Sequence, residues 1–190
     1  EYLAFLNDLH QNGRRAEAKE YAPKERANMD LDEGAMIYGQ NKDGTFFLTP
    51  DADGDMWEDE WPVLMVNWLC AQAYAEWYSR KTGFEWRLPT EAEWEKAARG
   101  VDGRTFTWGN TFETTRACTK HAHPIRQLPS KPGSYPFDIS PYGVYDMCGN
   151  AMNWCVDIYE GQRIIAGQKD TIPNAFDYPE GAERVFRGGS

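Results

Sequence analysis

Regular hydrophobic spacing stops near residue 100 of this chain, although aromatic residues continue to its end. Beyond Gly100, glycine, proline, asparagine and aromatic residues alternate, and only short stretches such as 154–159 and 184–186 are typical of strands. The 190 residues include 8 Trp, 10 Tyr and 9 Phe, which indicates a packed interior rather than a disordered segment. We therefore expect a second half built of ordered loops that side chains hold in place.

Apolar residues at helical spacing predict helices over residues 2–10 and 68–81. A third helix is expected to open at Thr90 and to end at Gly100. Thr90 and Glu93 match the capping-box pattern, in which each residue accepts a hydrogen bond from the other's backbone. These helices and the loops after them predict a domain with few helices and many ordered loops.

The remaining first half is polar and irregular from residue 14 to residue 62, with one short strand candidate at residues 45–48. The apolar run over residues 62–66 is short and begins at a proline, which favours a buried strand over a helix. No internal repeat or linker is evident. We expect one domain over residues 1–190, cut from a larger protein at both ends.

The chain is acidic, with 20 Lys and Arg against 30 Asp and Glu and a formal net charge of −10. This balance argues against a nucleic-acid partner, because few cations could displace counterions from phosphates. No apolar run approaches the ~18 residues of a membrane helix. The four cysteines allow three pairings into two disulfides, and reduced buried thiols are the commoner state for such scattered residues. The sequence therefore does not assign the protein to a cellular compartment.

Two short motifs hold metal-ligand residue types. Residues 51–55 place three carboxylates at alternate positions, as in the opening of a calcium loop. An EF-hand would need Gly and Glu where Met56 and Pro62 stand, so a solvated acidic turn is favoured. Cys118, His121 and His123 are soft-metal ligand types, but a zinc site usually has paired spacings. A polar surface loop is favoured there.

A longer pattern is more informative than these motifs. The residues from 62 to 190 closely resemble the formylglycine-generating enzyme (sulfatase-modifying factor) family. The residues that carry the resemblance are PVLMVNW (62–68), AYAEW (73–77), RLPTEAEWEKAARG (87–100), FTWGN (106–110), SPYGVYDMCGNAMNWCVD (140–157) and RVFRGGS (184–190). The early helix also resembles that of the family, and the loop over residues 51–61 resembles bacterial members, including those fused to serine/threonine kinases.

The resemblance implies a C-type-lectin-like α+β fold with little regular secondary structure. It also implies a calcium site, whose ligands here would be the side chains of Asp146 and Asn153 and the carbonyl groups of Gly149 and Ala151. Such oxygen ligands suit a hard cation.

Two residues of this segment depart from the family pattern. Met152 stands where the family usually has Trp, and Asn153 stands where it has Glu. An amide in place of a carboxylate removes one negative ligand, so calcium should bind more weakly or not at all. The alternative is a turn that Gly149 and Asn150 hold without metal.

Catalytic members of the family oxidise a peptidyl cysteine of a sulfatase to formylglycine, using oxygen and a copper ion held by two cysteines. The resemblance implies that Ser190 is an active-site serine and that the copper cysteines would follow it. None of Cys70, Cys118, Cys148 and Cys155 aligns with that pair, so copper is implied only if the pair lies beyond Ser190.

Two functions therefore remain in competition, with a polypeptide substrate or protein partner in either case. The first is a formylglycine-generating oxidase. The second is a non-catalytic, C-type-lectin-like binding or regulatory module, of the kinase-associated or variable-surface type, which the altered GNAMNW segment favours slightly. A pigment- or siderophore-maturation enzyme of the same superfamily is a third, weaker hypothesis.

Overall fold

The computed structural model describes residues 1–26, 33–51, 53–123, 128–159 and 183–189. The chain divides into two compact units, Glu1–Arg87 and Leu88–Ser190. Each unit has its own cluster of buried apolar side chains. The prediction of one domain over residues 1–190 stays a prediction. Among the described residues, no helix has both the length and the apolar character that a membrane crossing needs.

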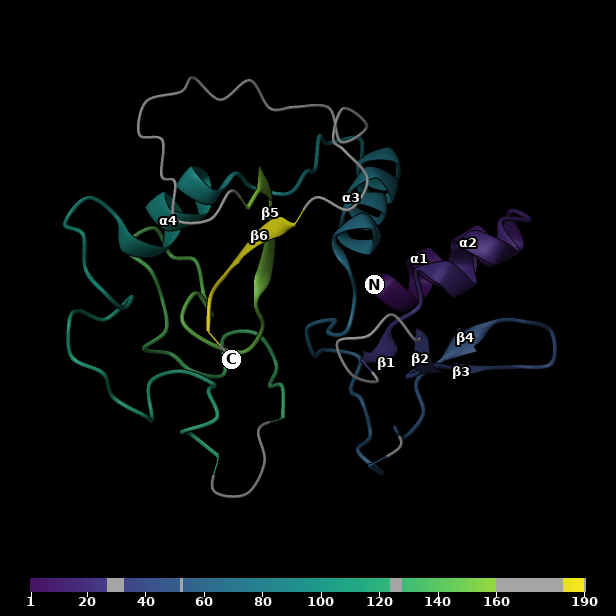
Figure 1. Cartoon of the computed structure of the whole chain (residues 1–190), viewed down its shortest axis with the longest axis horizontal. Coiled ribbons are helices and arrows are strands. Elements are labelled where there is room, and N and C mark those ends of the chain that lie inside the picture. Colours follow the sequence, from purple (N-terminus) through teal and green to yellow (C-terminus); the bar gives the residue numbers. More distant parts are fainter. Residues whose placement is uncertain (27–32, 52, 124–127, 160–182, 190) are drawn as a thin grey trace. The chain divides into compact units, whose positions relative to one another are not determined.

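The described residues of the first unit form three helices and four short strands (Figure 1). The helices are α1 (Tyr2–Gln11), α2 (Arg15–Glu20) and α3 (Trp68–Thr82). The strands pair as two antiparallel ribbons, β1 (Lys24–Arg26) with β2 (Glu33–Met36) and β3 (Gly39–Gln40) with β4 (Phe46–Phe47). The helix predicted over residues 68–81 is confirmed, and it ends at Gly83 in the left-handed conformation.

Aromatic side chains from α1 and α3 form the core of this unit. The ring of Phe5 lies 5.6 Å from that of Trp77 and 5.8 Å from that of Tyr74. The indole nitrogen of Trp77 donates a hydrogen bond of 2.9 Å to the carboxylate of Asp8. Cys70 is buried on the same helix, as its position on the apolar face predicts.

Two expectations for this half were wrong. Residues 62–66 form no strand, and Met65 has a φ of 58°, which is incompatible with extended backbone. Residues 14–62 are more regular than expected, because α2 and the first ribbon lie within them. The β1–β2 ribbon escapes prediction because all of β1 is charged and β2 contains Glu33 and Gly34, so no apolar alternation marks either strand.

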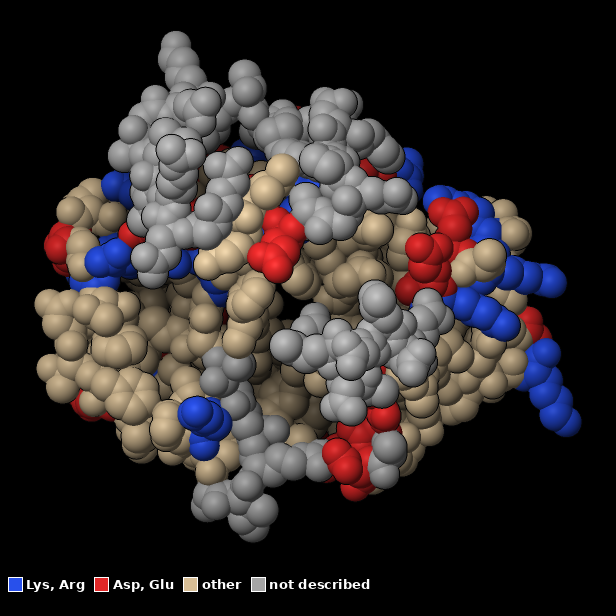
Figure 2. All heavy atoms as spheres, in the orientation of Figure 1, with Lys and Arg blue, Asp and Glu red and all other residues tan. Residues whose placement is uncertain are grey.

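The turn over residues 51–55 is capped by its own first carboxylate. Asp51 Oδ1 accepts hydrogen bonds from the backbone N–H groups of Asp53 and Asp55, and Oδ2 accepts one from the indole of Trp57. Acidic side chains gather at this turn in Figure 2. The arrangement is an Asx-type turn, as the favoured interpretation of this motif requires.

The second unit contains α4 (Glu91–Arg99) and one antiparallel ribbon of β5 (Asn153–Ile158) and β6 (Arg184–Arg187). The predicted capping box of Thr90 and Glu93 is present, and α4 ends before Gly100. The core packs Trp94 and Ala98 of α4 against Met147, Cys155 and Val185.

Two hydrogen bonds attach the start of α4 to β5. The carboxylate of Asp157 accepts a 2.6 Å hydrogen bond from the N–H of Glu91, at the positive end of the helix dipole. The N–H of Val156 donates to the carbonyl of Pro89. The other described residues of this unit lie largely in turns and isolated bridges, so the expectation of a loop-rich α+β fold is confirmed.

Candidate functional site

The turn that precedes β5 contains the predicted calcium ligands, and its backbone is unusual. Asp146 and Asn150 have φ values of 58° and 69°. Asp and Asn tolerate this left-handed region better than other non-glycine residues. A Cβ on Gly149 would lie 2.6 Å from the carbonyl oxygen of Cys118, so only glycine fits there. We refer to residues 146–153 as the GN turn.

Asn150 joins the GN turn to two distant segments. Its amide accepts a hydrogen bond from the N–H of Ser130 and donates one to the carbonyl of Ser130, each 2.9 Å long. Its backbone N–H donates a 2.7 Å hydrogen bond to the carbonyl of Cys118. The side chain is 4% exposed. A turn that Gly149 and Asn150 hold without metal needs such hydrogen bonds.

Proton donors already contact both side chains of the predicted calcium site. Asp146 Oδ2 accepts hydrogen bonds from the N–H of Gly133 at 3.0 Å and from the amide of Asn150 at 3.2 Å. Asn153 Oδ1 accepts one of 3.0 Å from the indole nitrogen of Trp94. A cation at these oxygens would displace those donors, so this arrangement does not fit calcium as it stands. Calcium binding stays a prediction.

Asp138 is a buried carboxylate that the sequence analysis missed. It is 0% exposed, and it accepts a 2.8 Å hydrogen bond from the hydroxyl of Thr107 and bonds of 3.0 and 3.1 Å from the N–H of Cys148. Burial raises the pKa of this carboxyl, and the hydrogen bonds oppose that effect. An aspartate near Gly and Pro usually indicates an exposed turn, and nothing local reveals that Thr107 covers it.

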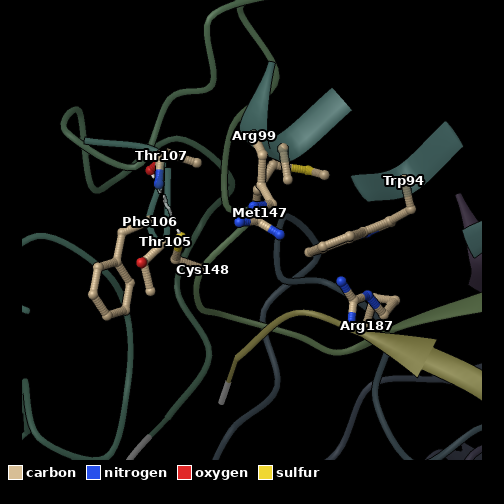
Figure 3. A pocket seen from close by; sticks show the side chains of 9 residues that line it. Trp94, Arg99, Thr105, Phe106, Thr107, Met147, Cys148 and Arg187 are labelled. Atoms are coloured by element: carbon tan, nitrogen blue, oxygen red, sulfur yellow. Dashed lines mark hydrogen bonds between the residues drawn. The ribbon is translucent and has the colours of Figure 1, made fainter. Parts of the chain in front are cut away.

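Cys148 faces the segment that contains Thr107. Its sulfur accepts a hydrogen bond from the N–H of Thr107, with an N to S distance of 3.3 Å. Burial raises the pKa of the Cys148 thiol. Figure 3 shows the two side chains next to each other at one wall of a cavity of about 220 Å³. Arg187, at the end of β6, lies beside Trp94 at the other wall.

The four cysteines are free, and three of them are buried. Cys118 is one of these, so the expectation of a polar surface loop is wrong for this residue. Its sulfur lies 3.4 Å from Nε2 of His123 and 3.4 Å from the carbonyl oxygen of Leu128. His121 instead packs edge-on against Phe112. Within the described ranges, no three His, Cys, Asp or Glu side chains are grouped to hold a metal. Ser190, the predicted active-site serine, lies outside the described residues.

These features define a class of protein: a loop-rich α+β domain in which a capped helix, a two-stranded ribbon and the GN turn are bonded together. The Sulfatase-modifying factor enzyme 1-like domain matches residues 18–190 of the chain. The chain therefore belongs to the formylglycine-generating enzyme (sulfatase-modifying factor) family.

Relatives that carry different names resemble the chain. Serine/threonine-protein kinase pkn1 of Chlamydia pneumoniae is 39% identical over 130 residues, which are 67% of this chain and 19% of that protein. The formylglycine-generating enzyme of Thermomonospora curvata is 32% identical over 159 residues, 77% of this chain and 50% of that protein. The inactive C-alpha-formylglycine-generating enzyme 2 of Bos taurus is 35% identical over 109 residues, 53% of this chain and 34% of that protein.

The chain thus spans half or less of the length of these curated relatives. Among solved structures, PvdO from Pseudomonas aeruginosa matches with a TM-score of 0.45 and 33% identity, over 52% of this chain and 39% of that chain. The relatives thus include a kinase, a formylglycine-generating enzyme and a protein named as inactive.

Proposed function

We propose that this chain is the substrate-recognising part of a formylglycine-generating protein, which binds a polypeptide and oxidises one of its cysteines to formylglycine. The observation that carries the proposal is the packing of the RGGS motif against the GN turn. A Cβ on Gly189 would lie 2.1 Å from the carbonyl oxygen of Cys148, and one on Gly188 would lie 3.3 Å from that of Ala151. The backbone that leads to Ser190 is therefore fixed by contact with the turn.

The resemblance gives Ser190 the role of an active-site serine, and a reacting group needs a backbone held in one position. The net reaction converts the substrate's CH₂–SH group to CHO. One oxygen atom of O₂ enters the aldehyde, and the sulfur leaves as hydrogen sulfide. The second oxygen atom becomes water with two electrons and two protons from two external thiols, which leave as a disulfide.

The copper ion that the resemblance implies would supply the activation of oxygen. Soft thiolate ligands suit Cu(I), but the described cysteines do not form a pair, and those nearest the motif serve other contacts. Cys148 contacts Thr107 and Cys155 is buried in the core.

The first test uses the natural full-length protein. The peptide that follows Arg187 is sequenced by tandem mass spectrometry with and without thiol alkylation. The oxidase proposal expects two alkylatable cysteines shortly after Ser190, and then copper-dependent loss of sulfur from a cysteine-containing sulfatase peptide. A following peptide without cysteines, or a substrate peptide left unchanged with copper and oxygen, would refute the oxidase.

A non-catalytic binding module is the second candidate, and one contact favours it. Asn153 stands where the family usually has Glu, and its amide oxygen is bonded to the indole of Trp94. In this chain, the altered residue of the GN turn therefore helps to pack α4 on β5. Recovery of one defined protein partner with the full-length protein, together with an inactive peptide assay, would support this candidate over the oxidase.

A further inference from the structure

Cys148, Thr107 and Asp138 form a chain of hydrogen bonds that begins at the cavity of the second unit. Cys148 and Thr107 both line this cavity of about 220 Å³ (Figure 3), and Asp138 is fully buried. The Cys148 sulfur lies 3.7 Å from the hydroxyl oxygen of Thr107, and that hydroxyl donates a 2.8 Å hydrogen bond to Asp138 Oδ1. A thiol at the cavity wall is thus joined to a carboxylate in the interior through one hydroxyl group.

The carboxylate sets the direction of these hydrogen bonds. An ionised carboxylate can only accept, so the hydroxyl of Thr107 donates to Asp138, and its own oxygen is left to accept from the S–H group of Cys148. The backbone N–H of Cys148 holds the same carboxylate in place, at 3.1 Å from Oδ1 and 3.0 Å from Oδ2. The proton of the Cys148 thiol therefore has a path of two hydrogen bonds to Asp138.

Thr107 also contacts the sulfur through its backbone. Its N–H donates a 3.3 Å hydrogen bond to Cys148 Sγ. The thiolate is the nucleophilic form of cysteine, and a hydrogen bond to a charged group stabilises the charged form. A nucleophile in contact with a proton acceptor, which a third group holds in place, is the arrangement of an activated side chain. Thr107 can thus accept the proton of Cys148 and stabilise the charge that remains on the sulfur.

The rest of the wall suits an uncharged molecule. The described apolar side chains there are Trp94, Ala98, Phe106 and Met147. The two cations of the wall, Arg99 and Arg187, both pair with the carboxylate of Glu95. The volume lies below the roughly 300–1,000 Å³ of pockets that hold drug-sized ligands, so the molecule must also be compact.

This chemistry limits what the thiol could attack. Transfer of an acyl or phosphoryl group develops charge on oxygen, which needs donors or cations aimed at that oxygen. A disulfide needs none, because its leaving group is itself a thiolate. We propose that Cys148 is a thiol–disulfide exchange site, at which the cavity admits a compact, uncharged disulfide and the hydroxyl of Thr107 passes the thiol proton to Asp138.

The exchange balances without a further reactant. As the Cys148 proton moves to the Thr107 oxygen, the hydroxyl proton moves to Asp138, and the sulfur attacks one sulfur of the disulfide RS–SR. The new S–S bond forms as the old one breaks. The thiolate RS⁻ takes the proton back from Asp138 through Thr107 and leaves as RSH. Cys148 is thereby oxidised to a mixed disulfide, and one half of the small disulfide is reduced to a thiol.

The natural full-length protein is incubated at neutral pH with hydroxyethyl disulfide, which is small and uncharged. Samples are quenched in acid at timed intervals, and the mixed disulfide on each cysteine is measured by peptide mass spectrometry. We expect Cys148 to react at least about tenfold faster than the buried Cys155. Glutathione disulfide, which is larger and charged, should react more slowly with Cys148 than hydroxyethyl disulfide does, because the cavity is compact.

Paired variants separate the relay from mere exposure of the sulfur. Thr107→Val removes the hydroxyl but keeps the backbone N–H, and it should slow exchange at Cys148 at least about tenfold. Thr107→Ser keeps the hydroxyl and should react at close to the wild-type rate. Asp138→Asn should match Thr107→Val, and the double variant should be no slower than either, because the two groups act as one unit. Asp59→Asn, at an exposed aspartate of the first unit, is the control.

Exchange at Cys148 no faster than at Cys155 would overturn the proposal. Equal rates in Thr107→Val and Thr107→Ser would overturn the relay, as would additive effects of Thr107→Val and Asp138→Asn. Thermal unfolding shows whether each variant is folded at the temperature of the assay, and the comparison of Val with Ser at residue 107 remains decisive if Asp138→Asn does not fold. The inference does not depend on the oxidation proposed above, so either can fail without the other.

Discussion

The indole nitrogen of Trp94 lies 3.0 Å from the amide oxygen of Asn153 and donates a hydrogen bond to it. The contact joins α4 to the first residue of β5, at the position where the family usually has a glutamate. A residue that the resemblance assigns to a metal thus holds a helix in place. This substitution separates the structural role of the GN turn from its expected ligand role, and the two can be tested independently.

Restoring the family's carboxylate should restore calcium binding. Asn153→Glu adds a negative oxygen ligand to the predicted calcium site, and we expect millimolar calcium to raise its melting temperature by several degrees. The wild type should respond less, and magnesium is the control ion. If neither the wild type nor Asn153→Glu responds to calcium in differential scanning fluorimetry, the calcium site does not exist in this chain.

Removing the amide of Asn150 should destabilise the second unit. Asn150→Ala loses both hydrogen bonds to Ser130 and leaves a β-carbon in a left-handed conformation, so we expect a loss of about 2–4 kcal/mol in the free energy of unfolding. Asn12→Ala, which removes an exposed amide bonded to Asp8, is the control and should cost less than about 1 kcal/mol. Equal urea midpoints for the two variants would contradict the role assigned to Asn150.

Two aspartates should give opposite pH dependence. The folded pKa of Asp138 is raised by burial, so the unfolded state releases its proton first and stability falls as pH rises above about 4. Hydrogen bonds from Arg104 lower the folded pKa of Asp102 to about 2, so its contribution is present above about pH 4 and is lost as pH falls toward 2.

Asp138→Asn and Asp102→Asn should therefore change the slope of stability against pH in opposite directions. Urea unfolding between pH 3 and pH 6, at steps of about half a unit, measures both slopes. The raised pKa assigned to Asp138 is contradicted if Asp138→Asn keeps the wild-type slope of stability against pH while Asp102→Asn changes that slope.

The glycine that packs on Cys148 should not tolerate even a methyl group. Gly189→Ala would place its Cβ 2.1 Å from the Cys148 carbonyl oxygen, so the backbone must move, at a cost of about 2–3 kcal/mol. Gly83→Ala meets no atom within 4 Å but keeps a left-handed φ, and should cost about 1 kcal/mol. Denaturant unfolding of both variants measures the difference, and a smaller loss for Gly189→Ala would argue against the observed contact.

The thiols should differ in reactivity in the folded protein. Burial raises the pKa of Cys155 to about 12, and its side chain is fully buried. Cys148 is half-buried at the cavity wall, although burial raises its pKa as well. Iodoacetamide at pH 8 should modify Cys148 before Cys155. The thiolate is the reactive form of cysteine, and the reagent must be able to reach it. Peptide mass spectrometry at timed intervals gives the order, which should disappear in urea.

Sequence reasoning succeeded where the causes are local. The capping box at Thr90 and the end of α3 at Gly83 depend on a few neighbouring residues, and both are present. The strand prediction for residues 62–66 failed because apolar character alone does not distinguish a strand from an irregular, partly exposed segment. Asp138 and Asn150 act through Thr107 and Ser130, which lie 31 and 20 residues away. Periodicity and propensity contain no information about such pairings.

The bonds of Asn150 and Asp138 also have a consequence for how such a domain can be altered. The segment between residues 118 and 150 is attached to the GN turn at separate points: the carbonyl of Cys118, the backbone of Ser130, the N–H of Gly133 and the carboxylate of Asp138. The lengths of chain between these points can change while the attachments stay the same. Insertions after residue 119 or residue 134 should therefore be accepted more readily than at the attachment points, which makes these intervals the natural places to graft a new recognition loop.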